Sequence, residues 1–187
     1  MKTRESGMPD RVMWEQFFDS NKVLTILGLD NQVGDVAEFG CGYGTFTIPA
    51  AKIIKGTIFG MDIEPEMVRI TNEEAKTQSL SNVKAVQRDF IANGSGLPDE
   101  SIDYVMLFNI LHLEDPSVLL NEAHRILKNS GKLGIIHWNY DPATPRGPSM
   151  AIRPKPDDCL SWAERAGFHS LSRFDLKPYH YGIVAVK

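Results

Sequence analysis

An acidic residue precedes three alternating glycines in the stretch EFGCGYG, residues 38–44. Glycine has no Cβ, so Gly40 and Gly42 permit a positive φ and allow a ligand to approach the main chain closely. The amides at the start of a following helix favour a bound carboxylate or phosphate. Glu38 stands in an otherwise apolar run, and carboxylates are seldom buried there without a partner. The stretch therefore indicates a ligand-binding loop with an acid beside it.

A second acid, Asp62, follows 22 positions after Gly40 at the end of another apolar run. A carboxylate at that place can accept hydrogen bonds from both hydroxyls of a ribose. Dinucleotide-binding loops have the pattern G-x-G-x-x-G, but Thr45 stands where the last glycine is required. These residues favour an adenosine ligand without a pyrophosphate. An NAD(P)-dependent oxidoreductase of Rossmann type stays open as an alternative.

Strand-like and helix-like segments alternate along the chain, and these elements must position the two acids. β-Like runs cover 35–40, 56–63, 83–89, 102–109 and 131–138. Helical patterns cover 64–79, 116–130 and 156–166, and a further helix is expected to begin at 45–47, because Pro49 fits only its first turn. This alternation predicts a parallel sheet covered by helices, in which the glycine loop and Asp62 meet at the carboxyl ends of the strands.

Three further segments lie outside that alternation. Two β-like runs, 169–176 and 179–187, predict a closing antiparallel hairpin. Residues 139–156 hold five prolines and predict a stiff loop on the substrate side. Residues 1–29 are expected to form a helical cap, with one broken or two short helices over 10–29.

The aromatic and cationic residues of these segments have two interpretations each. Trp14, Phe17 and Phe18 either pack on the domain or lie over the site. Arg4, Arg146 and Arg153 are either surface residues or ligands of an anionic substrate.

Composition limits the class of protein. A chain of 187 residues fits one domain, 1–187, and no apolar run reaches the roughly 18 residues of a membrane helix. The start of the chain carries charges and lacks a secretory pattern, so a cytoplasmic location is expected. A net charge of -4 without a basic patch argues against nucleic acid as a partner. Two cysteines, Cys41 and Cys159, form no metal-ligand spacing, and a monomer or homodimer is equally compatible with the sequence.

Five motifs in order resemble those of class I S-adenosylmethionine-dependent methyltransferases, particularly the group similar to the ubiquinone/menaquinone C-methyltransferases (methyltransferase type 11). They are EFGCGYG, GMDIEPEMV, QRDF, LPDESIDYVMLFNILHLEDP and LNEAHRILKNSGKLGIIHW, and they extend over residues 36–138. The resemblance implies a Rossmann-like, doubly wound, seven-stranded sheet. Its strand order is 3-2-1-4-5-7-6, with strand 7 antiparallel and helices on both faces. S-adenosylmethionine is the implied cofactor.

The resemblance also implies roles for individual residues. The backbone of the loop contacts the methionine part of the cofactor, Glu38 lies near its amine, Asp62 holds the ribose and Asp89 accepts from the adenine amino group. The complete set of implied cofactor-binding residues is Glu38, Gly40, Cys41, Gly42, Tyr43, Asp62, Ile63, Asp89, Phe90, Asn109 and Ile110. No metal is implied.

The implied reaction is in-line transfer of a methyl group to an unidentified, small-molecule acceptor. Asn109 is the candidate positioning group, and His112 and His137 are candidate bases, each of which has packing as its alternative. Alternation along the strand predicts that His137 and Trp138 point in opposite directions, so that only one faces the substrate. A non-catalytic S-adenosylmethionine-binding protein is a further alternative.

Overall fold

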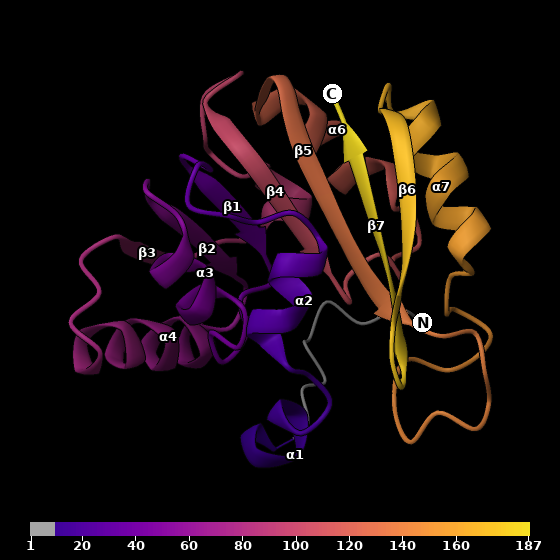
Figure 1. Cartoon of the computed structure of the whole chain (residues 1–187), viewed down its shortest axis with the longest axis horizontal. Helices are drawn as coiled ribbons and strands as arrows, with labels where there is room; N and C mark the ends of the chain where they lie inside the picture. Colours follow the sequence, from indigo (N-terminus) through magenta and orange to yellow (C-terminus); the bar gives the residue numbers. More distant parts are fainter. Residues whose placement is uncertain (1–9) are drawn as a thin grey trace.

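The computed structural model describes residues 10–187; Arg4 and the rest of residues 1–9 lie outside this range. The described strands form a seven-stranded sheet of order β3-β2-β1-β4-β5-β7-β6, in which β7 runs antiparallel to both of its neighbours and the other pairs are parallel (Figure 1). The strands are β1 (Val36–Phe39), β2 (Ile58–Asp62), β3 (Val83–Gln87), β4 (Ile102–Phe108), β5 (Leu127–Trp138), β6 (His169–Leu176) and β7 (His180–Val186). The predicted order and the antiparallel last strand are confirmed.

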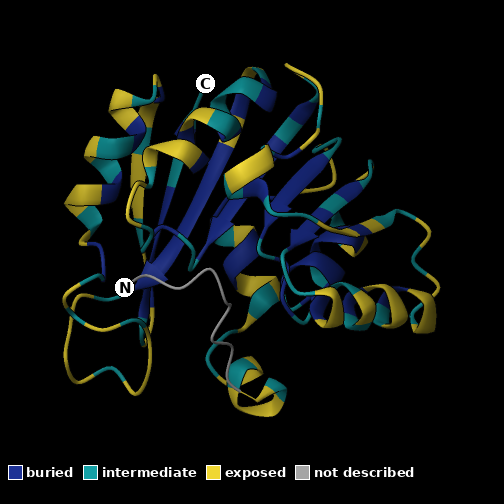
Figure 2. Cartoon of the chain, turned by 180° about the vertical axis from the view of Figure 1, so that it is seen from behind, coloured by how far each residue is buried: buried dark blue, intermediate teal, exposed yellow. Residues whose placement is uncertain are grey.

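Helices cover both faces of the sheet, as predicted. In Figure 1, α2 (Ser20–Ile26) and α3 (Thr47–Ile53) lie in front of the strands and α6 (Ser117–Ile126) lies behind them. The remaining helices are α1 (Arg11–Glu15), α4 (Pro65–Thr77), α5 (Phe90–Asn93) and α7 (Pro156–Arg165). Figure 2 shows the strands from behind as a buried layer beneath helices whose outer sides are exposed. Within residues 10–187, no helix combines the length and apolar character needed to cross a membrane.

Two apolar clusters hold these layers together. One joins α6 and α7 to the sheet through residues such as Leu120 and Cys159, and the other joins α2 and α3 to it through Leu24 and Ala50. Full burial of one leucine or isoleucine side chain stabilises the fold by roughly 1.5–3 kcal/mol. Because both faces are covered, the central strands are almost continuously apolar, and the polar site is confined to the edge where the strands end.

The glycine loop is held against the end of β2 by its backbone. The amides of Gly40 and Cys41 both donate to the Met61 carbonyl, at 2.7 and 3.0 Å. Gly40, Gly42 and Gly44 have φ values of +78°, +54° and +78°, which side chains with a Cβ rarely adopt. The helix behind the loop, α3, begins at Thr47 as predicted.

Two elements differ from the sequence prediction. The helix expected over 116–130 ends at Ile126, and β5 begins at Leu127 instead of residue 131. Leu127 pairs with Ile102, and both side chains are almost fully buried. The pairing with β4 places the Leu127 side chain in the core, and tertiary packing overrides helix propensity there.

The short helix α5 was not predicted at all. Asp89 caps it by accepting a hydrogen bond from the Ala92 amide at 3.0 Å. A helix of four residues is too short to produce a recognisable apolar period.

Residues 139–155 form the long loop between β5 and α7, and Arg153 organises it from inside. Its side chain is buried, and its guanidinium donates to the carbonyls of Pro148, Asn139, Asp141 and Arg146 at 2.8–3.2 Å, and also to Thr144 Oγ1. Five N–H donors are thereby used. Arg153 is therefore neither a surface arginine nor a ligand for an anionic substrate, in contrast to both interpretations of the sequence.

Candidate functional site

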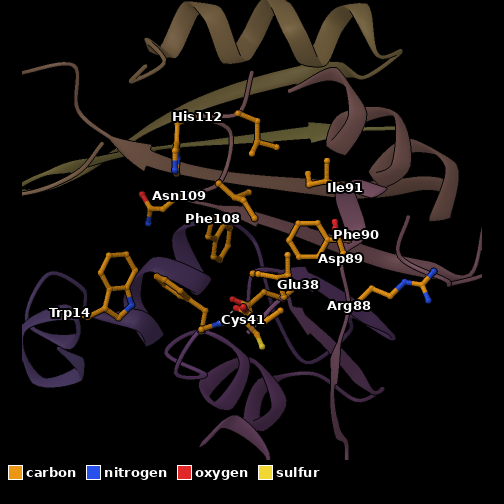
Figure 3. A pocket seen from close by; sticks show the side chains of 17 residues that line it. Trp14, Glu38, Cys41, Arg88, Asp89, Phe90, Ile91, Phe108, Asn109 and His112 are labelled. Atoms are coloured by element: carbon orange, nitrogen blue, oxygen red, sulfur yellow. Dashed lines mark hydrogen bonds between the residues drawn. The ribbon is translucent and has the colours of Figure 1, made fainter. Parts of the chain in front are cut away.

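A pocket opens at the carboxyl ends of β1, β2 and β4, between the glycine loop and the segment that follows β4 (Figure 3). It brings together most of the residues predicted from the sequence, namely Glu38, Gly40, Cys41, Gly42, Asp62, Ile63, Asp89, Phe90, Asn109, Ile110 and His112. These residues come from four separate segments of the chain, and the structure brings them together at this edge of the sheet, as predicted.

Two predicted site residues do not line this pocket. Tyr43 lies on the glycine loop near Asp10 and Glu64; burial, followed by these two acids, raises the pKa of its phenol. His137 lies behind His112, within the protein.

Six lining residues were not among the predicted site residues: Trp14, Phe46, Arg88, Ile91, Phe108 and Leu113. Five of them are next to, or two positions from, a predicted site residue or the glycine loop, so their proximity in sequence was the available signal. Arg88 directs its side chain away from the pocket in Figure 3, and its guanidinium donates to the carbonyls of Asn93 and Gly94. Trp14 had no such signal, because it comes from the distant α1.

Glu38 is the more deeply buried of the two acids beside the glycine loop. It is 1% exposed, and its carboxyl accepts a very short hydrogen bond from the Thr47 hydroxyl at the start of α3. Burial, together with the nearby Asp62, raises the pKa of Glu38 to about 8. Without a cation beside it, this carboxyl therefore holds a proton at neutral pH.

Asp62 ends β2 and holds the loop with both oxygens. Its Oδ2 accepts from the Gly42 amide at 2.9 Å, and its Oδ1 accepts from the Glu64 amide at 3.0 Å. Burial raises the pKa of Asp62, while these amides act in the opposite direction. A carboxylate has about four acceptor sites, so Asp62 retains capacity for further donors in the pocket.

Cys41 packs the loop onto the neighbouring elements. Burial, with Glu38 and Asp62 close by, raises the pKa of its thiol well above the ordinary value. A thiol that stays protonated is a poor nucleophile. Cys41 therefore lines the site as a protonated thiol.

Asn109 presents an unsatisfied amide at the end of β4. Its φ is +57°, a conformation that asparagine tolerates better than most residues, and its backbone amide donates to the Ile136 carbonyl at 2.7 Å. Its side-chain oxygen and nitrogen are buried and have no hydrogen-bond partner among the described residues. Buried polar groups are nearly always paired, so an amide without a partner among residues 10–187 is a candidate ligand-binding group.

His112 and His137 lie together beside that amide. The Nδ1 of His112 is 3.4 Å from the Nε2 of His137, and the two rings are almost perpendicular. Trp138 points to the other side of the sheet, as strand alternation predicts. Both side chains are nevertheless buried, because Trp138 packs against His180 and against Phe17 of the N-terminal segment.

Among residues 10–187, no cluster of three or more His, Cys, Asp or Glu side chains has an arrangement that could hold a metal ion. His124 and His180 lie outside the pocket. His180 packs between the rings of Phe18 and Trp138, and burial lowers its pKa to about 3.

The profile of a protein family described as a methyltransferase domain matches residues 36–131, which is about half of the chain. The chain belongs to this family. The matched region contains the glycine loop, Asp62, Asp89, Asn109 and His112, that is, most of the pocket.

Individual relatives agree with this assignment. A demethylmenaquinone methyltransferase from Geobacillus sp. (strain WCH70) is 29% identical over 50% of this chain and 40% of its own length. Aklanonic acid methyltransferase DauC from Streptomyces sp. (strain C5) is 32% identical over 52% of this chain and 45% of its own. The matches thus span less than half the length of these curated relatives. A SAM-dependent methyltransferase from Aquifex aeolicus superposes with a TM-score of 0.82 at 26% identity, over 95% of this chain and 93% of that one.

These findings confirm three predictions from the sequence. The chain is a class I S-adenosylmethionine-dependent methyltransferase that resembles the ubiquinone/menaquinone C-methyltransferases, it has the Rossmann-like fold, and S-adenosylmethionine is its cofactor. The assignments of individual residues and of the acceptor remain predictions.

The pocket of this methyltransferase fits that cofactor on structural grounds. One part carries the acids Glu38, Asp62 and Asp89, and the opposite part carries Asn109 and His112 among apolar side chains. Figure 3 shows Asp89 and Phe90 on one side, and Asn109, His112 and Trp14 on the other. S-adenosylmethionine has an ammonium group, a ribose diol and an adenine amino group, and all three can donate to carboxylates.

Proposed function

We propose that this methyltransferase transfers the methyl group of S-adenosylmethionine to a small, uncharged organic acceptor by in-line displacement. The observation that carries the proposal is the division of the pocket into an acidic part and a neutral part. We further propose that the chain is a single domain over 1–187 with a cytoplasmic location. Residues 1–29 and 139–156 would select the acceptor.

The acidic part would hold the cofactor. Glu38 would pair with the ammonium group, Asp62 would accept from the ribose hydroxyls, and Asp89 would accept from the adenine amino group, with Ile63 and Phe90 packing on the adenine. An ammonium beside Glu38 would restore the ionised carboxylate, which burial alone disfavours. Ligand binding and loss of a proton from Glu38 are then coupled.

The neutral part would hold the acceptor. Its lining consists of Trp14, Phe46, Phe108, the amide of Asn109 and the imidazole of His112. The guanidiniums of Arg88 and Arg153 are occupied by backbone carbonyls, so neither offers a salt bridge to a phosphate or carboxylate. This lining suits a flat apolar molecule with a few polar groups.

Bound S-adenosylmethionine supplies an electrophilic methyl group on a sulfonium. The residues of the neutral part would hold the acceptor atom in line with the carbon–sulfur bond of the cofactor, which would leave as a neutral thioether. No negative charge develops on the leaving group, so the contribution of the chain is alignment and exclusion of water. Asn109 would orient the acceptor through its unsatisfied amide.

Calorimetry with S-adenosylmethionine and with NAD, followed by transfer of a tritiated methyl group across a panel of metabolites, tests this function. We expect binding of S-adenosylmethionine in preference to NAD, and label in an uncharged acceptor. Preferential NAD binding would restore the oxidoreductase alternative. Tight binding without transfer to any member of a broad panel would favour the non-catalytic alternative.

Substitution of Asp62→Ala tests the cofactor site itself. Hydrogen bonds to a charged group are worth about 1.5–3 kcal/mol each, so loss of two ribose contacts should weaken S-adenosylmethionine binding by about a hundredfold or more. The domain should remain folded, because Asp62 lies at the edge of the core. Glu66→Ala, which removes an exposed acid of α4, is the matched control. Unchanged affinity in the Asp62 variant, measured by calorimetry, would refute the assigned role.

A further inference from the structure

A threonine of α4 contacts the glycine loop from outside the pocket. Thr71 lies in the middle of α4 and is fully buried. Its hydroxyl donates to the Gly42 carbonyl at 2.9 Å, whereas the Cys41 sulfur lies 4.0 Å away. A hydroxyl has one proton, so the carbonyl at ordinary hydrogen-bond distance receives it. The contact therefore joins a helix that does not line the pocket to the backbone of a loop that does.

This hydrogen bond differs from the one that a threonine inside a helix often makes. Such a hydroxyl can donate to the carbonyl four positions earlier in its own helix. Thr25 of α2 does so, since its Oγ1 is 2.9 Å from the Asn21 carbonyl. Threonine also has a lower helix propensity than alanine. Thr71 thus contributes to a contact between two elements of the fold, and not to the helix that carries it.

The backbone of Gly42 is held at both of its polar groups. Its amide donates to Asp62 Oδ2 at 2.9 Å, and its carbonyl accepts from Thr71 at the same distance. The φ of Gly42 is +54°, which favours glycine, but glycine also has more backbone freedom than any other residue. Side chains from β2 and α4 therefore restrain the residue whose type permits the loop conformation.

The methyl group of Thr71 packs against the same loop. A Cβ added to Gly44 would lie 3.2 Å from this methyl carbon and 3.2 Å from the hydroxyl oxygen. The helix itself is fixed by other contacts, because the Asn72 side chain exchanges hydrogen bonds of 2.9 and 3.3 Å with the Ala85 backbone of β3. Removal of the Thr71 hydroxyl should leave α4 in place and change only the loop.

We propose that Thr71 is a positioning residue of the cofactor site, which holds the Gly42 peptide in the orientation that receives the methionine part of S-adenosylmethionine. This inference rests on the proposed function, which pairs the ammonium group with Glu38, and on the predicted contact between the loop backbone and the methionine part. Gly42 lines the pocket and Thr71 does not, so Thr71 acts through Gly42. A loop that is already ordered loses less conformational entropy when the ligand binds.

The proposal distinguishes the two ends of the cofactor. The adenine and the ribose would lie against Asp89 and Asp62, whereas the methionine part would lie against the loop backbone. Without the Thr71 hydroxyl the Gly42 peptide can turn, but Asp62 keeps the hydrogen bond from the Glu64 amide to its Oδ1. Ligands with the methionine part should then bind more weakly, and ligands that end at the thioether should bind as before.

Calorimetry with two ligands tests this difference. S-adenosylhomocysteine carries the amino-acid chain, and 5′-methylthioadenosine has the same adenosine and sulfur without it. Thr71→Val replaces the hydroxyl with a methyl group of similar size and removes the donor. We expect the Kd of S-adenosylhomocysteine to rise about fivefold to tenfold, the effect of one neutral hydrogen bond, and that of 5′-methylthioadenosine to change by less than about twofold.

Further variants separate the hydroxyl from packing. Thr71→Ser keeps the hydroxyl and should bind S-adenosylhomocysteine like the wild type; this rescue decides if 5′-methylthioadenosine binds the wild type too weakly to measure. Thr71→Ala also lacks the hydroxyl and is smaller, so it replaces Thr71→Val if that variant does not fold. Thr25→Val, which removes an exposed threonine hydroxyl of α2, is the matched control and should leave both Kd values unchanged.

Four results would overturn the positioning role. Three concern folded variants: an unchanged Kd of S-adenosylhomocysteine without the hydroxyl, an equal loss of affinity for both ligands, or a loss in Thr71→Ser as large as that in Thr71→Val. The fourth is failure of both the valine and the alanine variants to fold, which would assign the hydroxyl to domain stability. Failure of the proposed function is distinguishable, because the wild-type chain would then bind neither S-adenosylmethionine nor S-adenosylhomocysteine.

Discussion

The protonation state of Glu38 that stabilises the free protein differs from the one that cofactor binding would require. The carboxyl is buried beside Asp62 and its pKa is raised to about 8, although an exposed glutamate ionises near 4.5. The folded chain therefore binds one more proton than the unfolded chain between these two pH values. By linkage, the contribution of Glu38 to the free energy of unfolding falls as pH rises from about 4.5 to about 8 and is then constant.

Substitution of Glu38→Gln should remove this pH dependence. Glutamine keeps an oxygen for the Thr47 hydroxyl but cannot ionise, so the variant should become more stable than the wild type as pH rises. The advantage should reach a few kcal/mol above pH 8, at about 1.4 kcal/mol per pKa unit. Thermal unfolding between pH 5 and pH 9 measures it. S-adenosylmethionine should bind more weakly to the variant, because a neutral amide does not pair with the ammonium group.

The control for this prediction is Glu164→Gln, which changes an exposed glutamate of α7. This variant should retain the loss of stability that Glu38 causes as pH rises. If the Glu38 variant also ran parallel to the wild type, Glu38 would already be ionised in the free protein, and the coupling between cofactor binding and proton release would be wrong.

At the scale of elements, one buried side chain, that of Arg153, holds the loop of residues 139–155 together. Proline limits the conformations of its backbone, and Arg153, near the end of the loop, connects to carbonyls at its start and in its middle. Gly147 lies so close to Trp138 and Arg153 that an added Cβ would be 2.8 Å from each. A loop of this length is therefore ordered without a helix or a strand.

Replacement of Arg153→Met should release this loop. The methionine fills part of the volume but donates no hydrogen bonds, so the loop carbonyls must turn to water. We expect the free energy of unfolding to fall by about 1–3 kcal/mol, less than for a fully enclosed site, because most of the loop is exposed. Limited proteolysis should cut the variant faster within residues 139–152.

Arg146→Met is the matched control, because Arg146 belongs to the same loop. Within residues 10–187 its guanidinium contacts the Met13 sulfur, at 3.8 Å, and no loop carbonyl. Its cleavage rate should equal that of the wild type. Equal rates for both variants would mean that the prolines alone hold the loop.

At the scale of the whole molecule, the N-terminal segment connects parts that the sheet keeps apart. Arg11 pairs with Glu74 of α4 at 3.1 Å, Phe17 packs on Trp138 of β5, and Phe18 packs on Phe46 beside the glycine loop. The helix α1, which belongs to this segment, lies beyond the carboxyl ends of the strands (Figure 1). The two interpretations of this aromatic patch both hold in part: Phe17 and Phe18 pack on the domain, and Trp14 lines the pocket.

Trp14→Ala should therefore affect binding more than folding. None of the residues of α1 is buried, so thermal stability should change little. Loss of the indole from the pocket should weaken binding of S-adenosylmethionine or of the acceptor by roughly tenfold, which corresponds to about 1.4 kcal/mol. Val12→Ala, on the exposed side of the same helix, is the control for calorimetry. Equal affinities in the two variants would leave Trp14 with a packing role only.

Much of the fold could be predicted because its signals are local. Alternating strand and helix patterns, Pro49 in the first turn of α3 and the terminal hairpin each depend on neighbouring residues, and they lead to the observed sheet. The elements that were predicted wrongly, or not at all, lack such a local signal. The early start of β5 depends on the pairing of Leu127 with Ile102, which is 25 residues away, and α5 has too few residues for a period.

The sequence by itself determined the family, the sheet and the cofactor, because their signals lie within short segments. The glycine spacing and the positions of Glu38 and Asp62 can be read directly from the order of residues. Only the tertiary structure decided which distant side chains meet: the pairing of His112 with His137, the enclosure of Arg153 by its own loop, and the place of Trp14 in the pocket. Such contacts are set by packing across the sheet, and neither residue type nor periodicity specifies the partner. The chemistry at the acceptor end of the pocket depends on these contacts.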